Sequence, residues 1–191
     1  MSPGAARPRA VVVTASNRAA AGVYADTGGP LIVDALREWG FEVGEPLVVP
    51  DGEPVERALR GAVEDGVSAV VTTGGTGVSP TDETPERTRA VLTYEIPGLA
   101  EAIRAYGVDH GVPTAMLSRG LAGVAGRTVI VNLPGSRGGV RDGLAVLHDV
   151  LPHAVDQVRG GDHARAAEPE PTGETAGVTG TDPTAREGGQ P

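Results

Sequence analysis

A glycine-rich stretch is the clearest chemical signal in this sequence. Residues 72–82 read TTGGTGVSPTD, and glycines there allow positive φ angles and a close approach of backbone amides to a ligand. The residues that we expect to contact a ligand are Thr73, Gly74, Gly75, Thr76 and Gly77. Such amides form an anion-binding nest when they lead into a helix start. The chain has no Lys and therefore no Walker A loop. An ordinary tight turn is the alternative interpretation.

A second small-residue turn, Pro134-Gly135-Ser136, follows another apolar run and precedes Arg137. A Pro-Gly turn is common and has a purely structural interpretation. Two glycine-rich segments that each follow a strand nevertheless favour a phosphate-rich ligand more strongly than either segment does alone.

Two aspartates, Asp51 and Asp82, each follow an apolar run closely. A pair of carboxylates that faces bound phosphates suits Mg²⁺, a hard cation that bridges phosphate oxygens. The alternative is that each aspartate caps the helix that follows it, a role that Asp fills well. The residues alone favour the two interpretations about equally.

Ser118 and Arg119 lie in the segment AMLSRGLAG. The arginine is able to hold a phosphate through two parallel hydrogen bonds. A solvent-exposed arginine on a helix is the favoured interpretation from the sequence.

The elements that must position these residues alternate along the chain. Short β-branched runs predict strands at 9–14, 41–49, 68–73 and 128–132, and helical periodicity or start signals predict helices near 31–39, 54–63, 84–90, 97–108 and 140–158. Strands that alternate with helices predict an α/β fold with a doubly wound, mostly parallel sheet. Ligands of such sheets bind beyond the carboxyl ends of the strands, where all the candidate segments above fall.

Composition excludes several kinds of chemistry. The chain of 191 residues has no Cys, which excludes thiolate metal sites and thiol nucleophiles, and its four histidines form no metal-binding pattern. A net charge of −9 argues against non-specific nucleic-acid binding. The sequence has no hydrophobic leader or membrane-length apolar run, so we expect a soluble, cytoplasmic protein. We predict a flexible segment at 1–8, one domain at 9–160 and a disordered acidic tail at 161–191.

Three segments together carry a family resemblance: TTGGTGVSPTDETPE, YEIPGLAEAIR and AMLSRGLAGVAGRTVIVNLPGS. They resemble the Mog/MoaB family of molybdenum cofactor biosynthesis, whose domain also occurs in gephyrin. The likeness extends from about residue 9 to residue 160. It implies a three-layer α/β/α fold and molybdopterin adenylyltransferase activity, in which ATP adenylylates molybdopterin in a Mg²⁺-dependent reaction and pyrophosphate leaves.

The resemblance also implies roles for individual residues. By motif position, Asp51 and Asp82 match the family's two aspartates that serve metal binding and catalysis. The positions that match substrate-contacting segments are Asp26, Gly28, Gly29, Gly74, Gly75, Thr76, Gly77, Ser118, Pro134, Gly135 and Ser136. A homotrimer or homohexamer and other proteins of the cofactor pathway as partners come with the resemblance.

Two positions depart from the family pattern. Asn17 stands where the family often has Asp, and Thr81 stands where a basic residue frequently precedes the aspartate. Both catalytic aspartates are retained, which favours an enzyme. The alternative is a scaffold protein that binds molybdopterin with little or no turnover.

Overall fold

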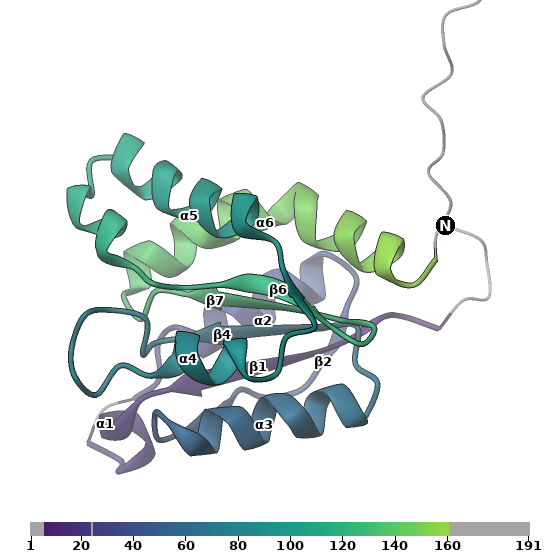
Figure 1. Ribbon diagram of the computed structural model, residues 1–191, viewed down its shortest axis with the longest axis horizontal. Coiled ribbons are helices and arrows are strands. Elements are labelled where there is room, and N and C mark those ends of the chain that lie inside the picture. The colour runs from purple at the N-terminus through teal and green to yellow at the C-terminus, as the bar shows by residue number, and fades with distance from the viewer. Residues whose placement is uncertain (1–5, 24, 161–191) are drawn as a thin grey trace, which may run out of the picture.

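The computed structural model describes residues 6–23 and 25–160 (Figure 1). Most of the predicted N-terminal segment 1–8 and all of the predicted acidic tail 161–191 lie outside the described residues. The strands are β1 (Arg9–Ala15), β2 (Glu42–Val43), β3 (Leu47–Val49), β4 (Ala69–Thr73), β5 (Tyr94–Glu95), β6 (Ala122–Ala125) and β7 (Thr128–Leu133). The helices are α1 (Asn17–Ala20), α2 (Gly29–Glu38), α3 (Glu53–Glu64), α4 (Thr84–Arg89), α5 (Pro97–Asp109), the 3-10 helix η1 (Pro113–Leu117) and α6 (Arg137–Val158).

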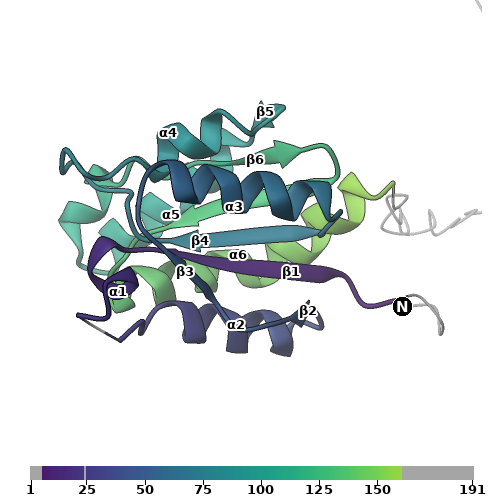
Figure 2. The ribbon, with the colours of Figure 1, turned by 90° about the horizontal axis from the view of Figure 1, so that it is seen from below.

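One sheet runs through the middle of the domain in the order β2-β1-β4-β7-β6-β5, and β3 pairs with β1 beyond the end of β2. The strands β1, β2, β3, β4 and β7 are parallel to one another. At one edge, β6 pairs antiparallel with β7, and β5 pairs antiparallel with β6. Figure 1 shows α5 and α6 on one side of the sheet and α3 and α4 on the other. Figure 2 shows α2 on the side opposite α3. The predicted three-layer α/β/α architecture is confirmed.

The central strand β4 explains the two cores. All five of its residues are buried, because helices cover both faces of the sheet. Val71 packs into one core with Ile32 of α2 and Leu147 of α6. Val70 packs into the other core with Leu59 of α3. These cores fix the strand ends relative to one another, and thereby fix the loops that leave them.

Two predicted boundaries were wrong, and each has a local cause. The segment 41–49 forms two short strands instead of one, since Gly44 and Pro46 interrupt it, although both strands still pair with β1. The helix α4 starts at Thr84, as predicted, and the Thr84 hydroxyl donates to Asp51. The last helix starts at Arg137, because the Ser136 hydroxyl accepts a hydrogen bond from the amide of Gly139.

Across residues 6–23 and 25–160, none of the helices combines the length and the apolar character that crossing a bilayer requires.

Candidate functional site

The loops predicted to bind a ligand meet at the carboxyl edge of the sheet. Thr14 of β1 is in register with Thr73 of β4, which is in register with Leu133 of β7. The loops that follow these three strands therefore lie side by side, and β3, whose Val49 pairs with Ala15, brings Asp51 to the same edge. The structure thus brings together segments that lie more than 100 residues apart in the chain.

Glycine is required in this edge because the loops touch each other. Gly74 and Gly75 have φ angles of +92° and +62°, in the left-handed region. A Cβ atom on Gly74 would overlap with the carbonyl oxygen of Ala15, and one on Gly75 would overlap with the carboxylate of Asp51. The amides of Gly75, Thr76 and Gly77 make no hydrogen bond within the described part of the chain. Three consecutive unpaired N–H groups are the donors that the predicted anion nest requires.

Asp51 does not cap α3, the helix that follows it. Gly52 occupies that N-cap position and no side chain caps the helix. The Asp51 carboxylate instead accepts hydrogen bonds from the amide of Gly52 (2.7 Å), the hydroxyl of Thr84 (3.1 Å) and the amide of Glu83 (3.2 Å). Asp51 therefore stabilises the start of α4, about 30 residues further along the chain, and keeps oxygen lone pairs that can face a cation.

Asp82 shares a cavity with Asp51. One oxygen of the Asp82 carboxylate accepts a hydrogen bond from the amide of Ser79 (3.2 Å), and Glu83, not Asp82, is at the N-cap of α4. Both carboxylates line a cavity of about 190 Å³ whose other residues are Ala15, Ser16, Asn17, Arg18, Gly75 and Thr81. The simple capping alternative for the two aspartates does not account for this convergence.

The residues present suit a Mg²⁺ ion that also contacts a ligand. Asp51 and Asp82 supply two carboxylates to one cavity. The described residues contain no group of three or more His, Cys, Asp or Glu that could hold a metal by themselves. Mg²⁺ is commonly held by one or two carboxylates together with substrate phosphates and water. The donor set therefore fits a cation that binds together with a phosphate-bearing substrate.

The two departures from the family pattern lie in this cavity. The side-chain oxygen of Asn17 accepts a hydrogen bond from the amide of Asp51 (3.1 Å), so a neutral amide fills an acceptor position there. The hydroxyl of Thr81 is 3.1 Å from that of Ser79. Both side chains thus support the loops that carry the aspartates, without adding a charge.

The prediction that Arg119 is a solvent-exposed helical residue was wrong. Arg119 follows η1 and lies outside any helix. Its guanidinium donates to the carbonyl oxygens of Gly77 (2.7 Å) and Asp82 (2.5 Å) and pairs with the carboxylate of Glu86. Its amide donates to the carbonyl oxygen of Thr76 (2.8 Å). Arg119 therefore clamps both ends of the glycine-rich loop.

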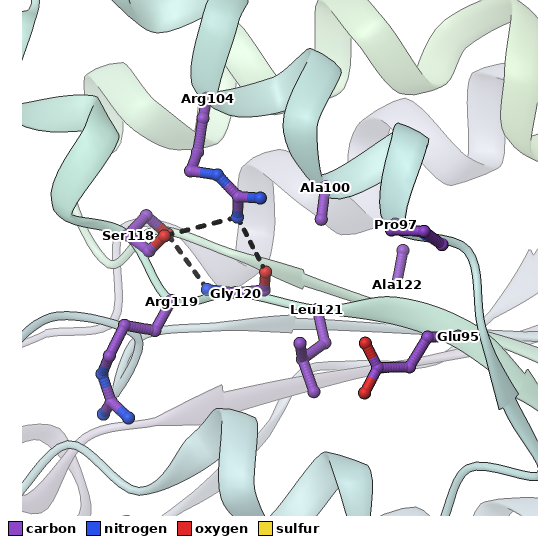
Figure 3. A pocket seen from close by; sticks show the side chains of 9 residues that line it. All are labelled: Glu95, Pro97, Ala100, Arg104, Ser118, Arg119, Gly120, Leu121 and Ala122. Carbon is purple, nitrogen blue, oxygen red and sulfur yellow. Dashed lines mark hydrogen bonds between the residues drawn. The ribbon is translucent and has the colours of Figure 1, made fainter.

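The segment that carries Arg119 is itself held by Arg104 of α5, which the sequence did not single out. Arg104 donates to the carbonyl oxygens of Ser118 (3.3 Å) and Gly120 (3.1 Å), and Figure 3 shows these contacts beside a cavity of about 240 Å³. The Ser118 hydroxyl is within 3.5 Å of Thr76. Ser118 is thus in contact with the glycine-rich loop, as its prediction as a substrate-binding residue requires.

The predicted first ligand loop is held by its own aspartate. The Asp26 carboxylate accepts hydrogen bonds from the amides of Gly28 (3.0 Å) and Gly29 (2.9 Å) and from the hydroxyl of Thr14 (2.7 Å). Thr73 donates its hydroxyl to the carbonyl oxygen of Pro134 (2.8 Å). The groups of Asp26 and Thr73 are thus engaged in holding loops together at the edge of a cavity of about 150 Å³, which Gly28, Gly74 and Gly135 also line.

A larger cavity of about 310 Å³ lies on the other side of the glycine-rich loop. It is bounded by the loop, by Asp82 and Ser118, by the Pro134-Gly135-Ser136 turn, by η1 and by the first turns of α6. It shares Gly75 and Asp82 with the cavity of about 190 Å³. The two cavities are therefore neighbours that meet at the glycine-rich loop and the Asp82 carboxylate.

Salt bridges fix the helix that supplies donors to Asp51. Arg87 of α4 pairs with Glu83 (2.6 Å) and Glu56 of α3 (3.7 Å), and Arg60 pairs with Glu56 (2.8 Å). The hydrogen bond from Arg60, opposed by partial burial and reinforced by the charges of Arg60 and Arg87, lowers the pKa of the Glu56 carboxyl. The start of α4 is therefore anchored to α3 as well as to Asp51.

A parallel α/β sheet with unpaired backbone amides and two carboxylates at its carboxyl edge is typical of domains that bind phosphate-bearing ligands. A family model described as "Probable molybdopterin binding domain" matches residues 11–153. The chain belongs to this family, as the resemblance in the sequence indicated.

Individual relatives agree with this assignment. A protein named molybdopterin adenylyltransferase from Helicobacter pylori is 37% identical over 153 residues, which cover 78% of this chain and 86% of that protein. A molybdenum cofactor biosynthesis bifunctional protein from Chlorobaculum tepidum is 36% identical over 159 residues, 82% of this chain. The chain spans about half the length of this bifunctional protein and of a second one from Synechococcus elongatus.

Solved structures show the same fold. A molybdopterin biosynthesis Mog protein from Mycobacterium ulcerans is 55% identical, with a TM-score of 0.77, and the match covers 82% of this chain and 99% of that one. A structure described as MogA is 60% identical with the same TM-score, and the match covers 78% of this chain and 99% of that one.

Proposed function

We propose that this protein is a molybdopterin adenylyltransferase of molybdenum cofactor biosynthesis. One observation carries the proposal: the unpaired amides of residues 75–77 adjoin the cavity that Asp51 and Asp82 line together. This arrangement suits two reacting phosphates, and several relatives that share most of the chain carry the name of this enzyme.

In the proposed reaction, an oxygen of the terminal phosphate of molybdopterin attacks the α-phosphorus of ATP. A new P–O bond forms, the bond from the α-phosphorus to the pyrophosphate oxygen breaks, and pyrophosphate leaves. Such transfers depend on alignment and charge neutralisation more than on covalent catalysis. Asp51 and Asp82 would hold Mg²⁺, which when bound supplies positive charge to the phosphates.

The protein groups have separate tasks in this scheme. The amides of residues 75–77 bind phosphate oxygens, and Arg119 keeps the loop that carries them in place through the carbonyl groups of Gly77 and Asp82. Thr84 and the start of α4 orient the Asp51 carboxylate. The chain has neither Cys nor Lys, and this mechanism needs neither.

Replacing each aspartate by asparagine tests the proposal. Asp51→Asn and Asp82→Asn preserve the shape of the side chain and one acceptor oxygen but remove the charge that holds a cation. We expect both variants to fold and bind molybdopterin, whereas the rate of pyrophosphate release falls by at least ~10², equivalent to ~2.7 kcal/mol of transition-state stabilisation. Asp34→Asn, an exposed change on α2 outside these cavities, is the control. Rates like those of the wild type in both site variants would contradict the metal-holding role.

We also propose that the protein is a cytoplasmic homotrimer or homohexamer that meets other proteins of the cofactor pathway. The family resemblance supports this. Exposed apolar side chains at Tyr94 and Met116, which line none of the cavities described above, are compatible with a contact between copies. Light scattering on the purified protein measures the oligomeric state, and a monomer at micromolar concentration would contradict the proposal.

A further inference from the structure

The carboxylate of Asp142 differs from those of the predicted site aspartates. Asp142 lies on α6 and lines the cavity of about 310 Å³, half-buried. Within the described part of the chain it takes part in no hydrogen bond or ion pair, whereas Asp26, Asp51 and Asp82 all accept backbone hydrogen bonds. The two oxygens of this carboxylate are thus not engaged by the protein, and a ligand in the cavity can supply donors to them.

The neighbours of Asp142 offer it no cation. The residues one helical turn away on α6 are Gly138, Gly139, Ala145 and Val146, none of which has a polar side chain. Gly107 of α5 faces it so closely that a Cβ atom there would lie 3.8 Å from an Asp142 carboxylate oxygen. The side chain of Arg104 on α5 donates to the carbonyl groups of Ser118 and Gly120 and not to Asp142. The carboxylate is therefore available to a molecule in the cavity.

Asp142 and the glycine-rich loop lie at different ends of this cavity. Ser136 caps the start of α6 beside the glycine-rich loop, and Asp142 lies six residues further, or about 9 Å along the helix axis. The Asp142 end adjoins Ala115, which also faces Gly107, and Val112, whose amide donates to the carbonyl oxygen of Gly107. One end thus offers amides to a phosphate, and the other offers a carboxylate between apolar side chains.

We propose that Asp142 recognises the 2-aminopyrimidinone edge of a pterin ring, and so assigns this cavity to molybdopterin. This inference rests on the proposed function. The 2-amino group and the adjacent N3–H of a pterin are two neighbouring donors, which match the two oxygens of a carboxylate in the same way as the guanidinium of arginine does. Val112 and Ala115 supply apolar contacts for the ring.

The same chemistry excludes adenine from this end of the cavity. The Watson–Crick edge of adenine presents one donor and one acceptor, so one carboxylate oxygen would face a lone pair. Adenine therefore belongs elsewhere, and the ATP phosphates would enter from the neighbouring cavity that holds Asp51 and Asp82. Guanine presents the same pair of donors as a pterin, and the experiment must distinguish these two sources.

Direct binding measurements test the inference. The probes are neopterin monophosphate, the corresponding lumazine in which an oxo group replaces the 2-amino group, and guanosine monophosphate. Wild-type protein should bind the pterin at least ~10-fold more tightly than the lumazine, the effect of a lost hydrogen bond to a charged group. Asp142→Asn should abolish this preference, and Asp142→Glu should retain part of it. Asp156→Asn, an exposed change on the same helix, should have no effect.

The melting temperature of Asp142→Asn should equal or exceed that of the wild type, because an unpaired carboxylate is removed. The inference is overturned if the wild type does not prefer the pterin to the lumazine, or if Asp142→Asn keeps the same preference. It is also overturned if the wild type binds guanosine monophosphate more tightly than the pterin. These outcomes are separate from the proposed function. Wild-type protein that selects the pterin through Asp142 but forms no adenylylated product would sustain the inference and contradict the enzyme activity.

Discussion

Arg119 permits the sharpest test of how the glycine-rich loop is held. Its guanidinium joins the carbonyl groups of Gly77 and Asp82, at the two ends of the segment between the anion nest and α4. Arg119→Ala removes both contacts but leaves the backbone hydrogen bond from residue 119 to Thr76. The perturbation therefore loosens the loop without removing a strand or a core residue.

The magnitude follows from the contacts. A hydrogen bond to a charged group contributes about 1.5–3 kcal/mol when it is well buried. Because the Arg119 side chain is 37% exposed, we assign about 1 kcal/mol to each carbonyl contact and nothing to the exposed pair with Glu86. The loss of about 2 kcal/mol shifts the balance between closed and open loop about 30-fold. If only the closed loop binds substrate, the apparent affinity falls by up to the same factor.

Steady-state kinetics and melting curves check this prediction. Arg119→Ala should raise KM for molybdopterin and ATP by ~10- to 30-fold and leave kcat within ~3-fold, because saturating substrate closes the loop again. Arg119→Lys should be intermediate, since an ammonium lacks the planar fork that reaches both carbonyls. Arg89→Ala, which breaks only a surface pair with Glu95, is the control. Unchanged KM in a folded Arg119→Ala protein, or a fall in kcat alone, would refute the clamp.

Two further predictions concern the loop and the helix beside it. Gly75→Ala should lower the melting temperature and abolish turnover, because a Cβ atom would overlap with the Asp51 carboxylate; Gly66→Ala has a similar φ (+66°) but open space around it and should only lower stability. Activity retained in Gly75→Ala would remove this contact from the account. The lowered pKa of Glu56 means that its ionised form stabilises the fold at pH values above its ordinary pKa of about 4.5, and that this contribution disappears as the pH falls through the lowered value. The melting temperature of Glu56→Gln should therefore be below that of the wild type at neutral pH and converge with it as the pH falls below 4.5, and a constant difference would contradict this.

The parallel part of the fold could be predicted because its signals are local. The run at β4 is β-branched and buried on both faces, and the stripe of Leu31, Ile32 and Leu36 ends at Gly40. The antiparallel strands β5 and β6 were missed. The four residues of β6 pair with β7 across the turn at Gly126, and the two residues of β5 pair with β6, so pairing defines both strands and no periodicity reveals them.

The residues of the site also divide into those that the sequence could predict and those that it could not. The meeting of Asp51 with the loop of Gly75 follows from topology, since carboxyl ends of parallel strands share one edge. The contacts of Arg119 could not be predicted in this way, because its acceptors are backbone carbonyl groups 37 and 42 residues away. Every residue has a backbone carbonyl group, so the sequence does not show which ones accept. Asp142 could be noticed only by the absence of a basic residue one helical turn away, which becomes meaningful once the cavity beside it is known.

Transfer of label from ATP tests the central claim most directly. The purified protein would be incubated with molybdopterin, Mg²⁺ and ATP that is radiolabelled at the α-phosphate, and the products separated by chromatography. The account predicts that the label moves to a pterin-containing product in step with the release of pyrophosphate, and that neither Asp51→Asn nor Asp82→Asn does this at more than ~1% of the wild-type rate. Bound molybdopterin without any transfer of label would contradict it and identify the protein as a molybdopterin-binding scaffold.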